Sequence, residues 1–146
     1  MLTIETLWRN SKRFYCFWLI KCISFIAGIR GATTGVNDAL PVLIDSLGQL
    51  GTISSSRRFK HDIADMGNAS SAVLALRPVT FAYNDDAKNT KQYGLIAEEV
   101  DAIFPAIVVK DADGQPYTVQ YHVLPALLLN ELKKLAARVA VLEARK

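Results

Sequence analysis

Cysteine and histidine are scarce in this chain of 146 residues, which contains two of each. Cys16 and Cys22 match neither a CxxC motif nor a zinc-ligand spacing, so the sequence predicts neither a disulfide framework nor a metal site. His61 and His122 stand alone, and we assign them structural roles. No cofactor is predicted.

A large excess of one charge is also absent. The net charge is +3, which is too small and too evenly spread to indicate nucleic acid as a partner, although Arg57, Arg58 and Lys60 form a local basic spot. The length limits the chain to one domain with an appendage and excludes a large multidomain enzyme.

A long uninterrupted hydrophobic run is missing as well. The apolar run 14–20 follows basic residues, as in a signal peptide or membrane anchor, but Lys21 interrupts it. A spanning helix needs about 20 apolar residues. A membrane partner is therefore not favoured, and residues 1–23 are left unassigned. The alternative to a membrane or export role is an N-terminus outside the functional module, for example the junction left when a longer gene is truncated.

Glycine recurs from residue 24 to residue 54, with short β-branched or aliphatic pairs between the glycines. This pattern predicts short strands and tight turns. Such strands bury a core only when they stack in a repetitive structure or wind around copies of themselves. Residues 24–54 are therefore interpreted as the last turns of a longer β-rich structure.

Residues 55–146 are predicted to form an α+β domain of short helices and β-hairpins. The expected order is a helix capped by Asn68, two strands, a second helix, a hairpin and a C-terminal helix, at 70–76, 79–83, 92–96, 97–104, 107–121 and 124–146. The DADG turn at 111–114 lacks the later ligands of a calcium-binding loop, so it is read as the turn of the hairpin.

The C-terminal segment has the strongest periodicity. Apolar side chains alternate at spacings of four and three residues, which is the repeat of a coiled-coil seam, at Leu128, Leu132, Leu135, Val139 and Leu142. A helix of this length is marginal alone in water, so the stripe must pack on something. We expect other copies of the chain; the alternative is an amphipathic helix that packs on its own domain.

Four blocks then carry a resemblance to a known family: SSSRRFKHDI, LRPVTFAY, YGLIAEEVDAIFPAIVV and DGQPYTVQYHVLPALLLNELKKL. They resemble the C-terminal intramolecular chaperone of phage tail spikes and tail fibres, the self-cleaving serine/lysine peptidase domain of endosialidase type. The resemblance covers about residues 53–142, and the preceding segment 24–54 resembles the end of the β-rich fibre stalk that such domains follow. It implies an intertwined homotrimer that assists the folding of the stalk before it, and a place in the virion tail fibre or in the host cytoplasm during assembly, from a phage or a prophage.

The resemblance also implies the catalytic residues. The family motif places Ser55 as the nucleophile, Lys60 as the general base and the scissile bond between Ser54 and Ser55. A serine hydroxyl needs an adjacent base, and a lysine serves as one only when it is neutral. Ser56 stands where the family commonly has an acidic residue.

Two functions follow from these expectations. The first is an intramolecular chaperone that acts as a serine endopeptidase on its own chain, once and in cis. The alternative is a trimerisation cap of a fibre protein that never cleaves. A membrane-tethered regulator released by cleavage is a third possibility, which Lys21 argues against.

Overall fold

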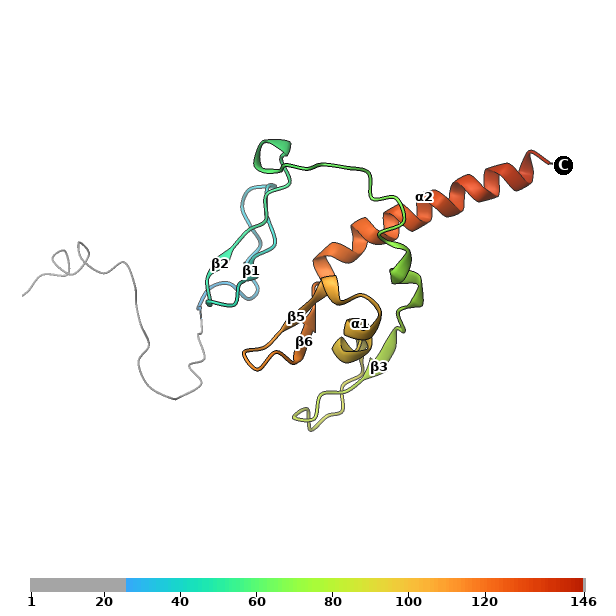
Figure 1. Ribbon diagram of the computed structural model, residues 1–146. Helices are drawn as coiled ribbons and strands as arrows, with labels where there is room; N and C mark the ends of the chain where they lie inside the picture. Colours follow the sequence, from blue (N-terminus) through green and yellow to red (C-terminus); the bar gives the residue numbers. More distant parts are fainter. Residues whose placement is uncertain (1–25, 146) are drawn as a thin grey trace, which may run out of the picture. The chain divides into compact units, whose positions relative to one another are not determined.

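The computed structural model describes residues 26–145, and the chain divides into two compact units, Met1–Ser56 and Arg57–Lys146 (Figure 1). The unassigned segment 1–23, with Cys16 and Cys22, lies outside the described residues. The domain boundaries predicted at residues 24 and 55 stay predictions.

The described part of the first unit contains one small hairpin. Strand β1, Leu43–Ile44, pairs antiparallel with β2, Leu50–Gly51. Its turn is held by the Asp45 carboxylate, which accepts hydrogen bonds from the backbone N–H groups of Leu47 and Gln49, both at 2.9 Å. Gly48 has a φ of +81°, which a residue with a side chain rarely adopts.

Apolar side chains of this unit lie on its surface. Leu47 is 90% exposed, and Ile26, Ile29, Val36, Leu40, Val42, Ile44, Leu50 and Ile53 are all more than half exposed. The short strands expected from the glycine pattern are therefore present at 43–44 and 50–51, but they do not bury these side chains within one chain. The stalk interpretation, which needs further copies, stays a prediction.

The second unit is a mixed α+β assembly of short elements, as predicted. Its strands form two antiparallel hairpins, β3 (Val79–Phe81) with β4 (Gln92–Gly94), and β5 (Val108–Lys110) with β6 (Pro116–Val119). Helix α1 spans Ala97–Ile103, and α2 spans Leu124–Glu143. Short 3-10 helices are η2 (Arg57–Phe59), η3 (Ser71–Ala75), η4 (Pro105–Ile107) and η5 (Tyr121–Val123).

The first expected helix differs from the prediction. Residues 71–75 form the 3-10 helix η3, and Ser70 rather than Asn68 occupies its N-cap position. Neither makes a side-chain cap, because the Ser70 hydroxyl is bonded to α2 instead. Leu76 is extended, and Arg77 precedes Pro78, a position that disfavours helical backbone. The cap at Asn68 was therefore predicted wrongly.

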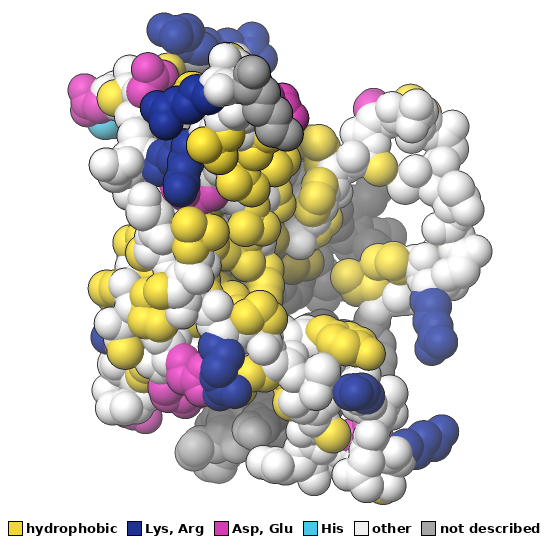
Figure 2. Space-filling view, turned by 90° about the vertical axis from the view of Figure 1, so that its right-hand side faces the viewer, with side chains coloured by type: hydrophobic (Ala, Val, Ile, Leu, Met, Phe, Trp, Pro, Cys, Tyr) yellow, Lys and Arg dark blue, Asp and Glu magenta, His cyan; other side chains and the backbone are white. Residues whose placement is uncertain are grey.

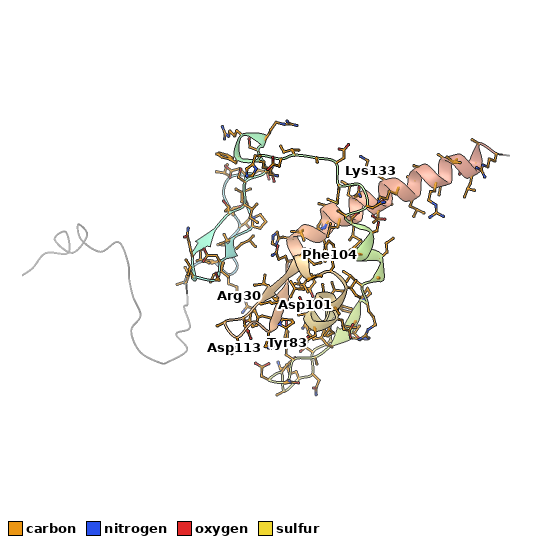
Figure 3. The ribbon with its side chains drawn as sticks, in the orientation of Figure 1. Arg30, Tyr83, Asp101, Phe104, Asp113 and Lys133 are labelled. Atoms are coloured by element: carbon orange, nitrogen blue, oxygen red, sulfur yellow. The ribbon has the colours of Figure 1, made fainter. Side chains whose placement is uncertain are left out.

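The loops of both hairpins are organised by aspartates. Asp111 Oδ1 accepts hydrogen bonds from the N–H groups of Asp113 and Gln115, and Gly114 has a φ of +78° (Figure 3). Asp86 accepts bonds from the N–H groups of Lys88 and Thr90 in the β3–β4 loop. The DADG segment is thus a hairpin turn, as predicted.

The core of this unit is small and draws one side chain from each of five elements. Val100 on α1 is its most buried member, at 1% exposure, and the others are Val73, Ile107, Val119 and Leu127. Phe104 packs against this cluster, whereas Ile103 is 40% exposed. The sequence pattern predicts that Val100, Ile103 and Phe104 share one buried face, so the buried face of α1 is narrower than predicted.

Helix α2 packs on its own unit through one face. Leu127 is buried, and Pro125 lies in the first turn, where a missing N–H costs nothing. Among residues 26–145, no helix combines the length and apolarity needed to cross a membrane.

Candidate functional site

The predicted cleavage segment is exposed. Ser54, Ser55 and Ser56 have no regular secondary structure and close the first unit. Arg57 opens the second unit, so the predicted nucleophile and base belong to different units. Each is therefore described in its own unit, and the dyad stays a prediction.

Lys60 follows a single turn of 3-10 helix. Its backbone N–H donates to the carbonyl of Arg57 at 3.0 Å, which closes the turn η2. The guanidinium of Arg58 lies over the ring of Phe59, 4.8 Å from its centroid, in a cation–π contact. The side chain of Lys60 is exposed, and the turn keeps it within one cationic segment with Arg57 and Arg58.

His61 is not part of the core. Its Nδ1 lies 2.7 Å from Asp62 Oδ2, and both side chains are more than nine-tenths exposed. An ion pair this exposed contributes little stability, so the structural role predicted for His61 is confined to the surface.

A buried polar cluster, which sequence reasoning missed, joins η3 to α2. Ser70 is fully buried, and its hydroxyl donates to Glu131 Oε1 at 2.5 Å. The Asn130 Nδ2 group donates to the Ser70 hydroxyl at 2.7 Å and to the Gly67 carbonyl at 2.8 Å. Lys134 donates to Glu131 Oε1 at 2.7 Å. We call these residues, Ser70, Asn130, Glu131 and Lys134, the Ser70 cluster.

The charge of Glu131 is stabilised within this cluster. The hydrogen bond from Lys134, and then that from Ser70, lower the pKa of its carboxyl, although its side chain is only 10% exposed. Because no part of Ser70 reaches the surface, a substrate cannot contact its hydroxyl. The Ser70 cluster is therefore a structural joint. Its signal in the sequence was the polar pair Asn130 and Glu131 within a leucine-rich helix.

Two further ion pairs connect α1 to neighbouring segments. The Arg77 guanidinium donates to both carboxylate oxygens of Glu99, which lowers the pKa of Glu99 and raises the pKa of Arg77. Lys110 Nζ lies 3.2 Å from Asp101 Oδ2 (Figure 3). The sequence pattern alone indicates a solvated charge or a cap at Glu99. The Glu99 side chain instead links α1 to Arg77, which lies in the segment after η3.

The predicted seam of α2 is exposed in the single chain. The fractions are 51% for Leu128, 61% for Leu132, 55% for Leu135, 44% for Val139 and 61% for Leu142. Figure 2 shows hydrophobic side chains gathered on the face toward which the C-terminal end of α2 points. The helix therefore uses Leu127 and the Ser70 cluster for its own unit and leaves the apolar stripe without contacts that would bury it.

Within the described range, no group of three or more His, Cys, Asp and Glu side chains is placed to hold a metal ion. The site residues proposed from the sequence are thus the exposed segment 54–60 and the exposed stripe of α2. The first offers hydroxyls and an amine, and the second offers an apolar contact surface.

The comparison with known families bears on the first three sequence blocks. Residues 55–109 match the protein-family model described as chaperone of endosialidase, Peptidase_S74. The match begins at Ser55 and ends with the third block, so the block from residue 113 lies beyond it. No curated protein matches the chain. Residues 55–109 are therefore similar to the endosialidase chaperone family, which confirms the resemblance that the sequence blocks predicted for this part of the chain.

Proposed function

We propose that this chain is the chaperone unit of a phage tail fibre or tail spike, and that it promotes homotrimer formation and then releases itself by cutting between Ser54 and Ser55. The observation that carries the proposal is the family match, because it starts at the predicted nucleophile. The family description supports the chaperone role, and the family name supports serine peptidase chemistry.

The exposed stripe of α2 supports the assembly role. Five apolar side chains in a coiled-coil repeat, each between 44% and 61% exposed, provide a strong drive for association. The core within the unit has only five buried apolar residues, which is little for independent stability. Association of three copies through the stripe would supply the missing burial.

The cleavage step uses groups of the chain itself. Ser55 Oγ attacks the carbonyl carbon of Ser54 while Lys60 takes the hydroxyl proton. The C–N bond between the two serines breaks, the freed amino group of Ser55 takes up a proton, and an ester joins Ser54 to Ser55 Oγ. Water then hydrolyses this ester, which leaves a carboxylate on Ser54 and restores the Ser55 hydroxyl.

Assembly would time the cut. The Lys60 side chain is exposed in the single chain. Desolvation at a subunit contact, beside Arg57 and Arg58, would favour the neutral amine that acts as a base. Because nucleophile and scissile bond are adjacent in one chain, proximity replaces substrate binding.

The proposal is tested by expressing the full chain and following it by denaturing gel and intact mass. Wild type is expected to give a fragment that begins at Ser55, and Ser55→Ala and Lys60→Ala are expected to stay full length. Ser54→Ala and Ser56→Ala are the matched hydroxyl controls and should still cleave. Lys60→Arg keeps the charge but cannot deprotonate, so it should not cleave.

A full-length wild-type chain that nevertheless forms trimers would refute the cleavage and support the alternative, a non-cleaving trimerisation cap. Ser56→Asp addresses the departure from the family motif, because it restores the common acidic residue. Cleavage that appears only in Ser56→Asp would show that this chain has lost the activity through that position.

A further inference from the structure

An apolar groove is lined by η3 with the segment after it, by the β3–β4 hairpin and by the first turns of α2. Its volume is about 810 Å³, and its apolar walls on the side of η3 and α2 are formed by Val73, Leu76, Pro78, Leu124 and Leu128. Leu128 also opens the α2 stripe, so the groove and the stripe form one continuous apolar surface.

Leu129 is an exposed apolar residue that the stripe does not explain. It is 57% exposed and lies next to Leu128 in the sequence, outside the alternating 4-3 positions. In heptad terms the stripe occupies positions a and d, with Leu132 at a and Leu128 at d. Leu129 then falls at position e and Leu124 at position g.

The e and g positions of α2 match each other across two parallel helices. In a parallel coiled coil a g residue of one helix faces the e residue five positions later in its neighbour, and these contacts decide partner and orientation. On that spacing Leu124 faces the partner subunit's Leu129, and Arg138 faces the partner subunit's Glu143. An apolar side chain meets an apolar one, and a cation meets an anion.

An antiparallel pairing about the middle of the same segment fits poorly. There, e faces e and g faces g, so Leu129 would face the partner subunit's Glu143 and Arg138 would face its own copy. The first contact pairs a hydrocarbon with a carboxylate, and the second places two cations together. Glu131, at the remaining g position, is already bonded to Ser70 and Lys134 of its own chain.

We infer that the groove between η3 and α2 receives Leu129 of a second copy of this chain, with the two helices parallel and Arg138 paired with the partner subunit's Glu143. This inference rests on the proposed assembly and extends it. The interface includes η3, through Val73 and Leu76, and so it requires the folded unit rather than the helix alone.

The first test compares Leu129→Gln with Val141→Gln in the full chain carrying Ser55→Ala, so that every molecule keeps one length. Val141 is the matched control, because it is 53% exposed on the same helix but falls at the outer position c. Analytical ultracentrifugation should show that Leu129→Gln raises the concentration at half-assembly about tenfold or more, while Val141→Gln leaves it unchanged. Equal far-ultraviolet circular dichroism would show that both variants fold.

The second test reverses charges. Arg138→Glu and Glu143→Arg should each weaken assembly several-fold, and the double variant should recover most of that loss. Lys133→Glu, at the outer position b of α2, is the control and should change nothing (Figure 3). The single-variant effects should shrink in high salt, since partly exposed pairs are screened.

The outcomes separate this inference from the proposed function. A parent chain that is monomeric at all concentrations refutes the assembly itself. A parent that assembles, with Leu129→Gln and Val141→Gln behaving alike, refutes only the groove contact. If the variant that carries both Arg138→Glu and Glu143→Arg assembles no better than the more weakly assembling of the two single variants, the parallel pairing is refuted.

Discussion

Replacing Ser70 by alanine tests the joint between η3 and α2 most directly. The hydroxyl donates to the ionised Glu131 and accepts from Asn130, and it is fully buried. A hydrogen bond to a charged group contributes roughly 1.5–3 kcal/mol, and a neutral one about 1 kcal/mol. Both partners keep a second bond, from Lys134 to Glu131 and from Asn130 to Gly67, which limits the loss. We therefore expect Ser70→Ala to reduce the free energy of unfolding by about 2 kcal/mol.

Ser71→Ala is the matched control for this change. Ser71 is exposed, its hydroxyl accepts a longer bond of 3.3 Å from Lys134, and its hydrogen bond is the smallest of the causes that lower the pKa of Glu131. Its replacement should alter stability by less than about 0.5 kcal/mol. The two variants should be compared by urea unfolding of the full chain, followed by circular dichroism at one fixed protein concentration. Equal midpoints for the two serine variants would refute the assignment of the Ser70 cluster as a stabilising joint.

Three other changes test the packing and the charges of the second unit. Gly94→Ala places a Cβ 2.8 Å from the Tyr121 hydroxyl, so it should destabilise the chain by roughly 1–3 kcal/mol, and Tyr121→Phe should relieve part of this loss in thermal melts. Val100→Ala, at the most buried core position, should lower the free energy of unfolding by about 2 kcal/mol. If it shifts the urea midpoint by less than a valine-to-alanine change at an exposed position does, this expectation is contradicted. The lowered pKa of Glu131 means that its ionised form stabilises the fold above the unfolded value near 4.5, and that this contribution disappears as pH falls through the lower folded value. Urea midpoints of wild type and Glu131→Gln should therefore differ at neutral pH and converge in acid.

The hairpins and helices of the second unit were predictable because their signals are local. In the turn between β5 and β6, Asp111 accepts hydrogen bonds with its side chain and Gly114 adopts a positive φ. Both features depend only on residues within the turn, so the hairpin is predictable without the rest of the chain. Helix α1 ends before Pro105, and α2 begins with Pro125 in its first turn. Each of these features is decided within a few residues.

The Ser70 cluster was not predictable in the same way, because Ser70 and Glu131 are 61 residues apart in sequence. A serine near a helix start is ordinarily read as a cap, and a glutamate beside a leucine stripe as a solvated charge. The tertiary contact overrides both readings. It also explains why residues 71–75 form a 3-10 helix without a side-chain cap.

Part of the candidate site could be predicted from local sequence, and part could not. The family match supports the segment that begins at Ser55, and that segment also lies in the first of the four sequence blocks that carry the resemblance. The pairing of Ser55 with Lys60 spans the boundary between the two units, so it stays a prediction. In the proposed mechanism the sequence motif names the reacting groups, and assembly would determine when the exposed amine of Lys60 acts as a base.

One face of α2 packs on its own unit, and the exposed apolar stripe is the face that we propose for assembly. Leu127 and Leu128 are neighbours in sequence, yet Leu127 is 8% exposed and Leu128 is 51% exposed. The buried face, with Asn130 and Glu131, fixes the helix to η3, whereas an isolated helix of this length would be marginal in water. A helix that is already formed and oriented loses less conformational freedom when it binds a second copy. In the proposed assembly, the Ser70 cluster would therefore contribute without lying in the interface, because it fixes the orientation of α2 and of its apolar stripe relative to η3.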